Sequence, residues 1–298
     1  MTEPASPFAA ARAFIAGHAR ILDQRRAEAI FDGGPTEPVV AAVLAYRNAD
    51  GGFGHGLEPD TRCPDSQPLY AQVGLEAVAS VRARLPTDVT TSLCDHLASV
   101  SGPGGAVPIM VPSFARYPRA SHWQGAESFP PDLNPTAAIV GLLRGMEVDH
   151  LWLDEATEWC VSTLESDGPP TEAHALACVL GLLESMPGDS RTEAIAAQAQ
   201  AALDDVSYYR VDPDDPTYGL TPLDLAPSPD SPWRSWFDDD LVDAHLDRLA
   251  AEQQPDGGWP IRWEPPTDAA VLEWRGMVTL HALVTLDSYG RSPGPRGR

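Results

Sequence analysis

The sequence predicts an all-α protein built from repeated pairs of helices. Apolar residues recur at helical spacing along most of the 298-residue chain. A glycine-rich segment occurs twice, as Asp50–Pro59 and Asp256–Pro265, with Asp-Gly-Gly, an aromatic residue and Glu-Pro in register. Each copy lies between two helical runs, and one helix pair cannot bury its apolar face alone. The repeat therefore indicates a solenoid or a closed ring of helices.

The residues of the repeat fit a corner between two helices. The paired glycines supply backbone angles that a side chain would forbid. The preceding aspartate can bond its own backbone in a turn or cap the next residues of the chain. The aromatic residue can anchor the corner to the core. Gly102–Pro108 resembles a third, degenerate copy that lacks the aspartate and the aromatic residue.

Two of these segments resemble a known repeat. Gln254–Trp259 and Asn48–Phe53 are similar to the Q-x-x-D-G-x-W repeats of the terpenoid cyclase and protein prenyltransferase superfamily, specifically the prenyltransferase and squalene oxidase repeats. The resemblance implies the α/α toroid, a ring of inner helices surrounded by outer ones. In that family the repeats mostly brace helix ends, so they predict the ring better than the chemistry.

We expect about ten helices of useful length, about two fewer than a six-pair ring needs, and the shortfall should lie in two long irregular segments. These segments are Gly102–Asn134 and Val206–Phe237, and either could be a lid or a packed surface loop. The sequence predicts a single ring domain over residues 1–290 and a disordered basic tail over 291–298. The expected helices are Pro7–Leu22, continuing towards Phe31, then Val39–Tyr46, Leu69–Leu85, Asp88–Val100, a helix starting at Asn134–Thr136, Leu151–Leu164, Thr171–Leu183, Arg191–Leu203, Leu241–Leu249 with a start at Asp238 or Asp239, and Ala269–Leu286.

Composition and charge limit the class of protein. The formal net charge of -23 and the pI near 4.5 argue against a nucleic-acid partner, since phosphate binding needs clusters of basic residues. Every basic residue is arginine, which indicates a GC-rich genome, and we expect a bacterial one. No apolar run approaches the roughly 18–20 residues of a membrane span, and the N-terminus lacks a secretory apolar region. We expect a cytoplasmic, soluble protein whose four cysteines are mostly buried and reduced.

The segment Asp212-Pro213-Asp214-Asp215 has the D-x-D-D form of the class II terpene cyclases. The resemblance implies that Asp214 is the acid that protonates an alkene or epoxide, supported by Asp212 and Asp215. Such an acid must hold its proton in a dry cavity. A solvated turn in an acidic, proline-rich segment is the alternative.

Two possible metal sites are weaker candidates. Asp239, Asp240 and Asp243 fit the D-D-x-x-D form that holds Mg²⁺ on a diphosphate, but acidic residues at a helix start are also favoured by the helix dipole. Asp60 and Cys63 only poorly approximate a prenyltransferase zinc site. The sequence therefore predicts no metal and no cofactor.

The richest polar cluster lies at the first corner. Glu58 has a counterpart in Glu264, which suggests a shared structural task. His55 and Asp60 have no counterpart in the second copy, so they form the second catalytic candidate, a general acid–base pair. A hydrogen-bonded polar corner without catalysis is the alternative.

Aromatic residues could line an apolar cavity and stabilise a carbocation by cation–π attraction, or could simply be core. The candidate substrate-binding residues are Trp123, Trp233, Trp236, Trp263, Trp274 and Tyr218.

The resemblance implies a terpene-cyclase-like enzyme that binds an isoprenoid or similar apolar polyene and starts cyclisation with an acid, either Asp214 or the His55/Asp60 corner. Complete class II cyclases pair two such domains, so a second copy or a partner subunit could complete the site. One alternative is a non-catalytic ring that acts as a binding or interaction protein. Another is a carbohydrate-active α/α barrel with Glu58 and Asp60 as paired carboxylates.

Overall fold

The computed structural model describes residues 6–291, and its regular secondary structure is helical. Twelve α-helices occur in this part of the chain, and β-structure is limited there to isolated bridges. The prediction of an all-α protein is confirmed. The contacts divide the chain into two compact units, one of Val40–Tyr209 and one that joins the chain up to Val39 with the chain from Arg210. Helix α3 (Glu37–Leu44) contains the first boundary.

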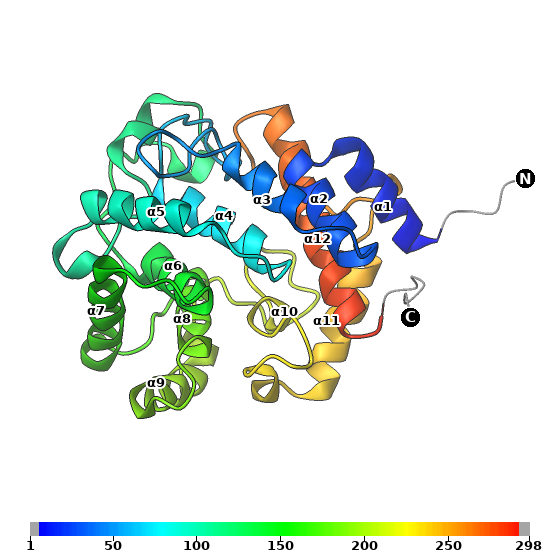
Figure 1. Cartoon of the computed structure of the whole chain (residues 1–298). Coiled ribbons are helices and arrows are strands. Elements are labelled where there is room, and N and C mark those ends of the chain that lie inside the picture. Colours follow the sequence, from blue (N-terminus) through cyan, green and yellow to red (C-terminus); the bar gives the residue numbers. More distant parts are fainter. Residues whose placement is uncertain (1–5, 292–298) are drawn as a thin grey trace, which may run out of the picture. The chain divides into compact units, whose positions relative to one another are not determined.

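The Val40–Tyr209 unit is built from two sets of alternating helices (Figure 1). In one set α6 packs against both α4 and α8, and in the other α7 packs against both α5 and α9. A Cβ atom on Gly141 of α6 would lie 2.7 Å from the carbonyl oxygen of Gly181 on α8, so this pair of small residues permits close packing. The helices are α4 (Pro68–Ala79), α5 (Thr87–Val100), α6 (Leu133–Gly145), α7 (Leu151–Asp167), α8 (Ala173–Glu184) and α9 (Ser190–Ala201).

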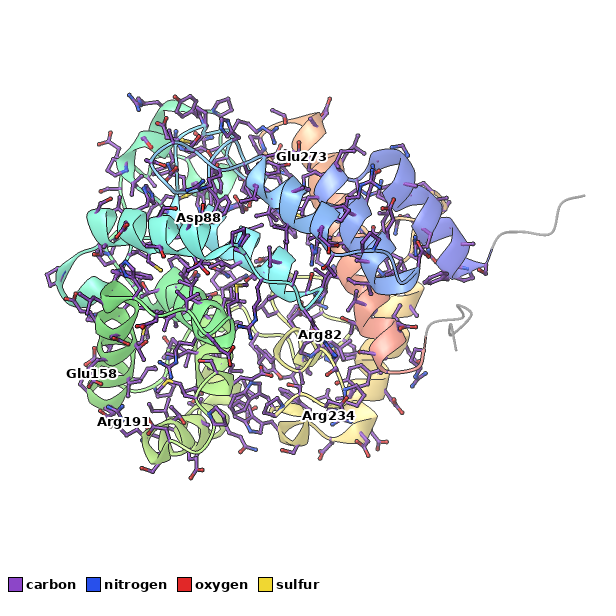
Figure 2. The ribbon with its side chains drawn as sticks, in the orientation of Figure 1. Arg82, Asp88, Glu158, Arg191, Arg234 and Glu273 are labelled. Atoms are coloured by element: carbon purple, nitrogen blue, oxygen red, sulfur yellow. The ribbon has the colours of Figure 1, made fainter. Side chains whose placement is uncertain are left out.

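Figure 2 shows how α7 and α9 are joined at their surface. Arg191 of α9 lies 3.3 Å from Glu158 of α7, and both side chains are solvent-exposed. An exposed ion pair of this kind contributes little to stability, so the apolar faces hold these helices together.

The other unit is organised around its longest helix, α12 (Asp268–Ser288), which packs against α1, α2 and α11 (Figure 1). Gly276 of α12 lies directly against Ala19, where an added Cβ would approach the Ala19 Cβ to 2.6 Å. The remaining helices of this unit are α1 (Pro7–His18), α2 (Ile21–Phe31), α10 (Pro222–Leu225) and α11 (Asp239–Ala251).

The two corners predicted from the repeat have the same backbone geometry. Asp50 Oδ1 accepts the Gly52 N–H at 3.0 Å, and Asp256 Oδ1 accepts the Gly258 N–H at 3.1 Å. The first glycine of each pair has a φ of +90° or +91°, which favours glycine. The aromatic residues are buried, as expected of core anchors. The predicted helix-to-helix corners are therefore confirmed.

The third, degenerate copy keeps the same turn. Gly102 N–H donates to the Ala106 carbonyl, and Gly105 N–H donates to the Gly102 carbonyl, as Gln254 and Gly257 do at the second corner. Gly105 has a φ of +81°. Val107 N–H donates to Thr136 Oγ1 at 2.9 Å, the same distance as Trp259 N–H to Thr279 Oγ1. The corner thus survives the loss of both the aspartate and the aromatic residue.

Two helix predictions are wrong. The first helix is not continuous, because the backbone is extended at Ala19 and Arg20, and Arg20 then pairs with the buried Asp23 at the start of α2. The helix expected to reach Leu85 ends at Ala79, because the chain turns at Arg82, whose φ is +54°. The short helix α10 lies in the second long irregular segment, as the expected shortfall in helices suggested.

Two predictions remain, a single ring domain over residues 1–290 and a disordered tail over residues 291–298. Arg291, the first tail residue, lies 2.8 Å from both Asp243 and Asp247 of α11. Residues 292–298 lie outside the described residues. The ring arrangement of the helices stays a prediction.

Candidate functional site

The candidate site forms where two irregular segments of the Val40–Tyr209 unit meet. Thr61 and Arg119 form an antiparallel bridge. Beside it, Ala120 N–H donates to the Asp60 carbonyl at 2.7 Å, and Arg62 N–H donates to the Pro118 carbonyl at 2.9 Å. The segment between α5 and α6 is therefore packed on the loop after the first corner.

This bridge brings a histidine to a buried carboxylate. His122 Nε2 lies 3.4 Å from Asp60 Oδ2. Asp60 is 5% exposed, whereas the His122 side chain is 45% exposed. His55, the predicted partner of Asp60, is an exposed residue with a φ of +60° in the turn. The structure thus places His122 beside Asp60, and the pairing of Asp60 with His55 stays a prediction.

A second carboxylate lies at the same loop. Glu58 is 4% exposed, and its Oε2 accepts the Asp60 N–H at 3.1 Å. Its repeat counterpart Glu264 is exposed, so the two glutamates do not share one environment. Glu58 and Asp60 therefore bring two buried carboxylates to one short segment.

Tyr70 of α4 completes the buried polar group. Its hydroxyl lies 3.1 Å from the Thr61 carbonyl, to which it donates. Burial raises the pKa of Tyr70, and the negative charge of Glu58 raises it further, so the phenol stays neutral. The Thr61 hydroxyl is also buried and has no hydrogen-bond partner among the described residues.

Gln67 fixes the loop to the segment that carries His122. It is fully buried, its Nε2 donates to Ser113 Oγ at 2.9 Å, and its Oε1 accepts the Val111 N–H at 2.8 Å. Arg116 adds an exposed ion pair with Asp65 at 3.2 Å. A packed surface loop describes this part of Gly102–Asn134 better than an open lid.

The D-x-D-D segment forms a solvated turn in the other unit. Asp212 Oδ1 accepts the Asp214 N–H at 2.9 Å, and the Asp214 side chain is 85% exposed. Hydrogen bonds from the N–H and the hydroxyl of Thr217 lower the pKa of Asp215. An acid that protonates an alkene needs the opposite, a dry carboxyl group that keeps its proton. This geometry fits the turn interpretation.

Two of the three aspartates of the D-D-x-x-D segment pair with arginines. Asp239 lies 2.5 Å from Arg234, and Asp243 lies 2.8 Å from Arg291. Within residues 6–291 no cluster of three or more His, Cys, Asp or Glu side chains has the geometry of a metal site. All four cysteines are buried and free, as predicted.

The predicted substrate-binding aromatic residues fall into three separate groups. Trp123 lies beside His122, with ring centroids 5.3 Å apart. Trp233 and Trp236 form a pair at 5.0 Å. Tyr218, Trp263 and Trp274 form an edge-to-face row, with centroids 5.5 Å and 4.9 Å apart. Of these groups, only Trp123 lies at the Asp60 loop.

A groove of about 490 Å³ lies at the first corner, away from these predicted residues. Asp88, labelled in Figure 2, is one of its lining residues. The others are Leu44, Arg47, Asn48, Ala49, Pro86 and Val89.

In the part of the chain that the structure describes, we find no helix with the length and apolar character needed to cross a membrane. No protein-family model matches the sequence, and no curated protein matches it. The resemblance to the terpenoid cyclase superfamily is thus carried by the short repeats alone.

His122 is the functional candidate that sequence reasoning missed. It lies in a long aromatic segment, far from the repeat in the chain, and its position beside Trp123 is the one local signal that could have found it. The pairing depends on the bridge between Thr61 and Arg119, which no local pattern signals.

Proposed function

We propose that this protein is a terpene-cyclase-like enzyme in which Asp60 is the proton donor and His122 is its partner. The observation that carries the proposal is the buried Asp60 carboxyl group with an imidazole nitrogen 3.4 Å away. Burial disfavours the charged form of a carboxyl group, and a general acid must hold its proton before it reacts.

The difference in exposure between the two groups suggests a direction for proton transfer. Acid-initiated cyclisation adds the carboxyl proton to a carbon of a terminal alkene or to the oxygen of an epoxide, and leaves a carboxylate and a carbocation. After ring closure the cation loses a proton to water or a base, which gives the neutral product. Asp60 must then regain a proton. The half-exposed His122 ring could take one from solvent and pass it to the carboxylate.

An apolar substrate is supported by the aromatic residues of the same segment. Phe114 is fully buried, and its ring lies 6.2 Å from Trp123 and 5.5 Å from Phe129. Aromatic faces attract a developing cation. The isoprenoid class itself comes from the resemblance of the repeats.

The test is to incubate the purified protein with farnesyl diphosphate, geranylgeranyl diphosphate and squalene, with Mg²⁺ and with a chelator, and to identify products by mass spectrometry. Asp60→Asn and His122→Gln are the site variants. Asp214→Asn is the matched control, because it removes an exposed carboxylate from the D-x-D-D turn.

We expect a cyclised product without Mg²⁺ and a loss of about 10²–10⁴-fold in rate for Asp60→Asn, the usual contribution of a general acid. Asp214→Asn should keep the wild-type rate. Loss of activity in Asp214→Asn alone would move the acid back to the D-x-D-D turn. Failure of every substrate would reject the isoprenoid class.

A further inference from the structure

We propose that Arg119 is the positioning residue of this site, holding His122 against Asp60; the catalytic part of this inference rests on the proposed function. His122 lies in the irregular segment between α5 and α6, within the short 3-10 turn Ser121–Trp123. A side chain in such a segment needs bonds from outside the turn to keep one orientation.

Arg119 supplies these bonds from within the same segment. Its Nε donates to the Trp123 carbonyl at 2.9 Å, directly after His122 in the chain. Its Nη1 donates to the Ala115 carbonyl at 2.5 Å. The Arg119 guanidinium thus joins Ala115 to Trp123, on either side of the residues that contact the Asp60 loop.

The planar face of the Arg119 guanidinium also packs on an aromatic ring. Its central carbon lies 5.6 Å from the centroid of the buried Phe114 ring, a cation–π arrangement. Among the described residues no carboxylate forms an ion pair with Arg119, so carbonyl groups and an aromatic ring satisfy this charge. Lysine cannot reproduce the arrangement, because it is a single donor centre without a planar fork.

The backbone of Arg119 belongs to the same arrangement. It forms the bridge with Thr61, and the adjacent Ala120 N–H donates to the Asp60 carbonyl. Gln124 Nε2 donates to the Arg119 carbonyl at 3.0 Å. Arg119 therefore links the carbonyl of Trp123, which its side chain binds, to the Asp60 loop, which its backbone binds.

The test uses the full chain with isotope-labelled histidine, whose eight residues give few ring signals in NMR spectra. His122→Gln identifies the His122 signal. Asp60→Asn is then introduced into the wild type, into Arg119→Lys and into the control Arg116→Lys. Arg116 lies in the same segment, but its side chain is exposed and pairs with Asp65.

We expect Asp60→Asn to displace the His122 signal in the wild type and in Arg116→Lys, and to leave it unchanged in Arg119→Lys. Circular dichroism checks that each variant is folded, and Arg119→Gln replaces the lysine variant if that one unfolds. A displacement of equal size in the folded Arg119 variant would overturn the inference.

The readout separates this inference from the proposed function, because the spectra need no substrate. If the spectra behave as expected and no polyene reacts, Arg119 positions His122 but the proposed chemistry is wrong. If cyclisation occurs, Arg119→Lys should lower kcat by roughly tenfold or more with little change in KM, since the lost contact acts on the proton donor.

Discussion

Replacing Gly257 with alanine should destabilise the protein strongly, for two reasons that the structure separates. The residue has a φ of +91°, which is unfavourable for any side chain. A Cβ atom there would also lie 2.3 Å from the carbonyl oxygen of Ala10 in α1, so helix and corner would have to move apart. The same conflict exists at the first corner, where a Cβ on Gly51 would lie 2.4 Å from the Ser92 carbonyl oxygen.

The magnitude comes from adding the two contributions. A left-handed conformation costs a non-glycine residue about 1–2 kcal/mol. Forcing extra volume into packed surroundings costs about 1–3 kcal/mol. Gly257→Ala should therefore lower the free energy of unfolding by about 2–5 kcal/mol.

Gly33→Ala is the matched control in the same unit. Gly33 has a φ of +64°, but no atom lies within 4 Å of an added Cβ, so only the conformational cost of about 1–2 kcal/mol applies. The free energies come from urea denaturation followed by circular dichroism, with equal m-values required for a direct comparison. A loss in Gly257→Ala no larger than in Gly33→Ala would refute the argument from close contact.

Two further predictions concern buried polar groups of the unit that contains α12. Thr279→Val should lower the free energy of unfolding by about 1–3 kcal/mol, because it leaves the buried N–H of Trp259 without an acceptor. Thr285→Val on the same helix should be neutral or stabilising, because the buried Thr285 hydroxyl has no partner among the described residues. Urea denaturation of both variants checks this, and equal losses would contradict it. Burial lowers the pKa of His245, so the unfolded chain binds a proton first as the pH falls below about 6.5, and stability is lost there. His245→Gln should show a smaller loss between about pH 7 and pH 5, and an unchanged slope would contradict the prediction.

The local part of the fold could be predicted from the sequence because its causes are local. Helical spacing of apolar residues locates most helices, with boundaries within a few residues. The Asp-Gly-Gly turn depends on hydrogen bonds between residues two to four positions apart, so its repetition is visible in the chain. The break between α1 and α2 is not decided there. Gly17 lies close to it but is itself part of α1, and the close contact of Ala19 with Gly276 comes from packing between distant segments.

The sequence by itself determined the helical class and the corners, whose causes lie within a few neighbouring residues, and the type and spacing of the cysteines indicated that they are buried and free. Only the tertiary structure decided which helix covers each corner and which histidine meets Asp60. Gln253 donates to the Pro7 carbonyl across 246 positions of the chain, and His122 reaches Asp60 through a bridge between two irregular segments. Such contacts depend on packing between distant segments, which leaves no periodic pattern in the sequence.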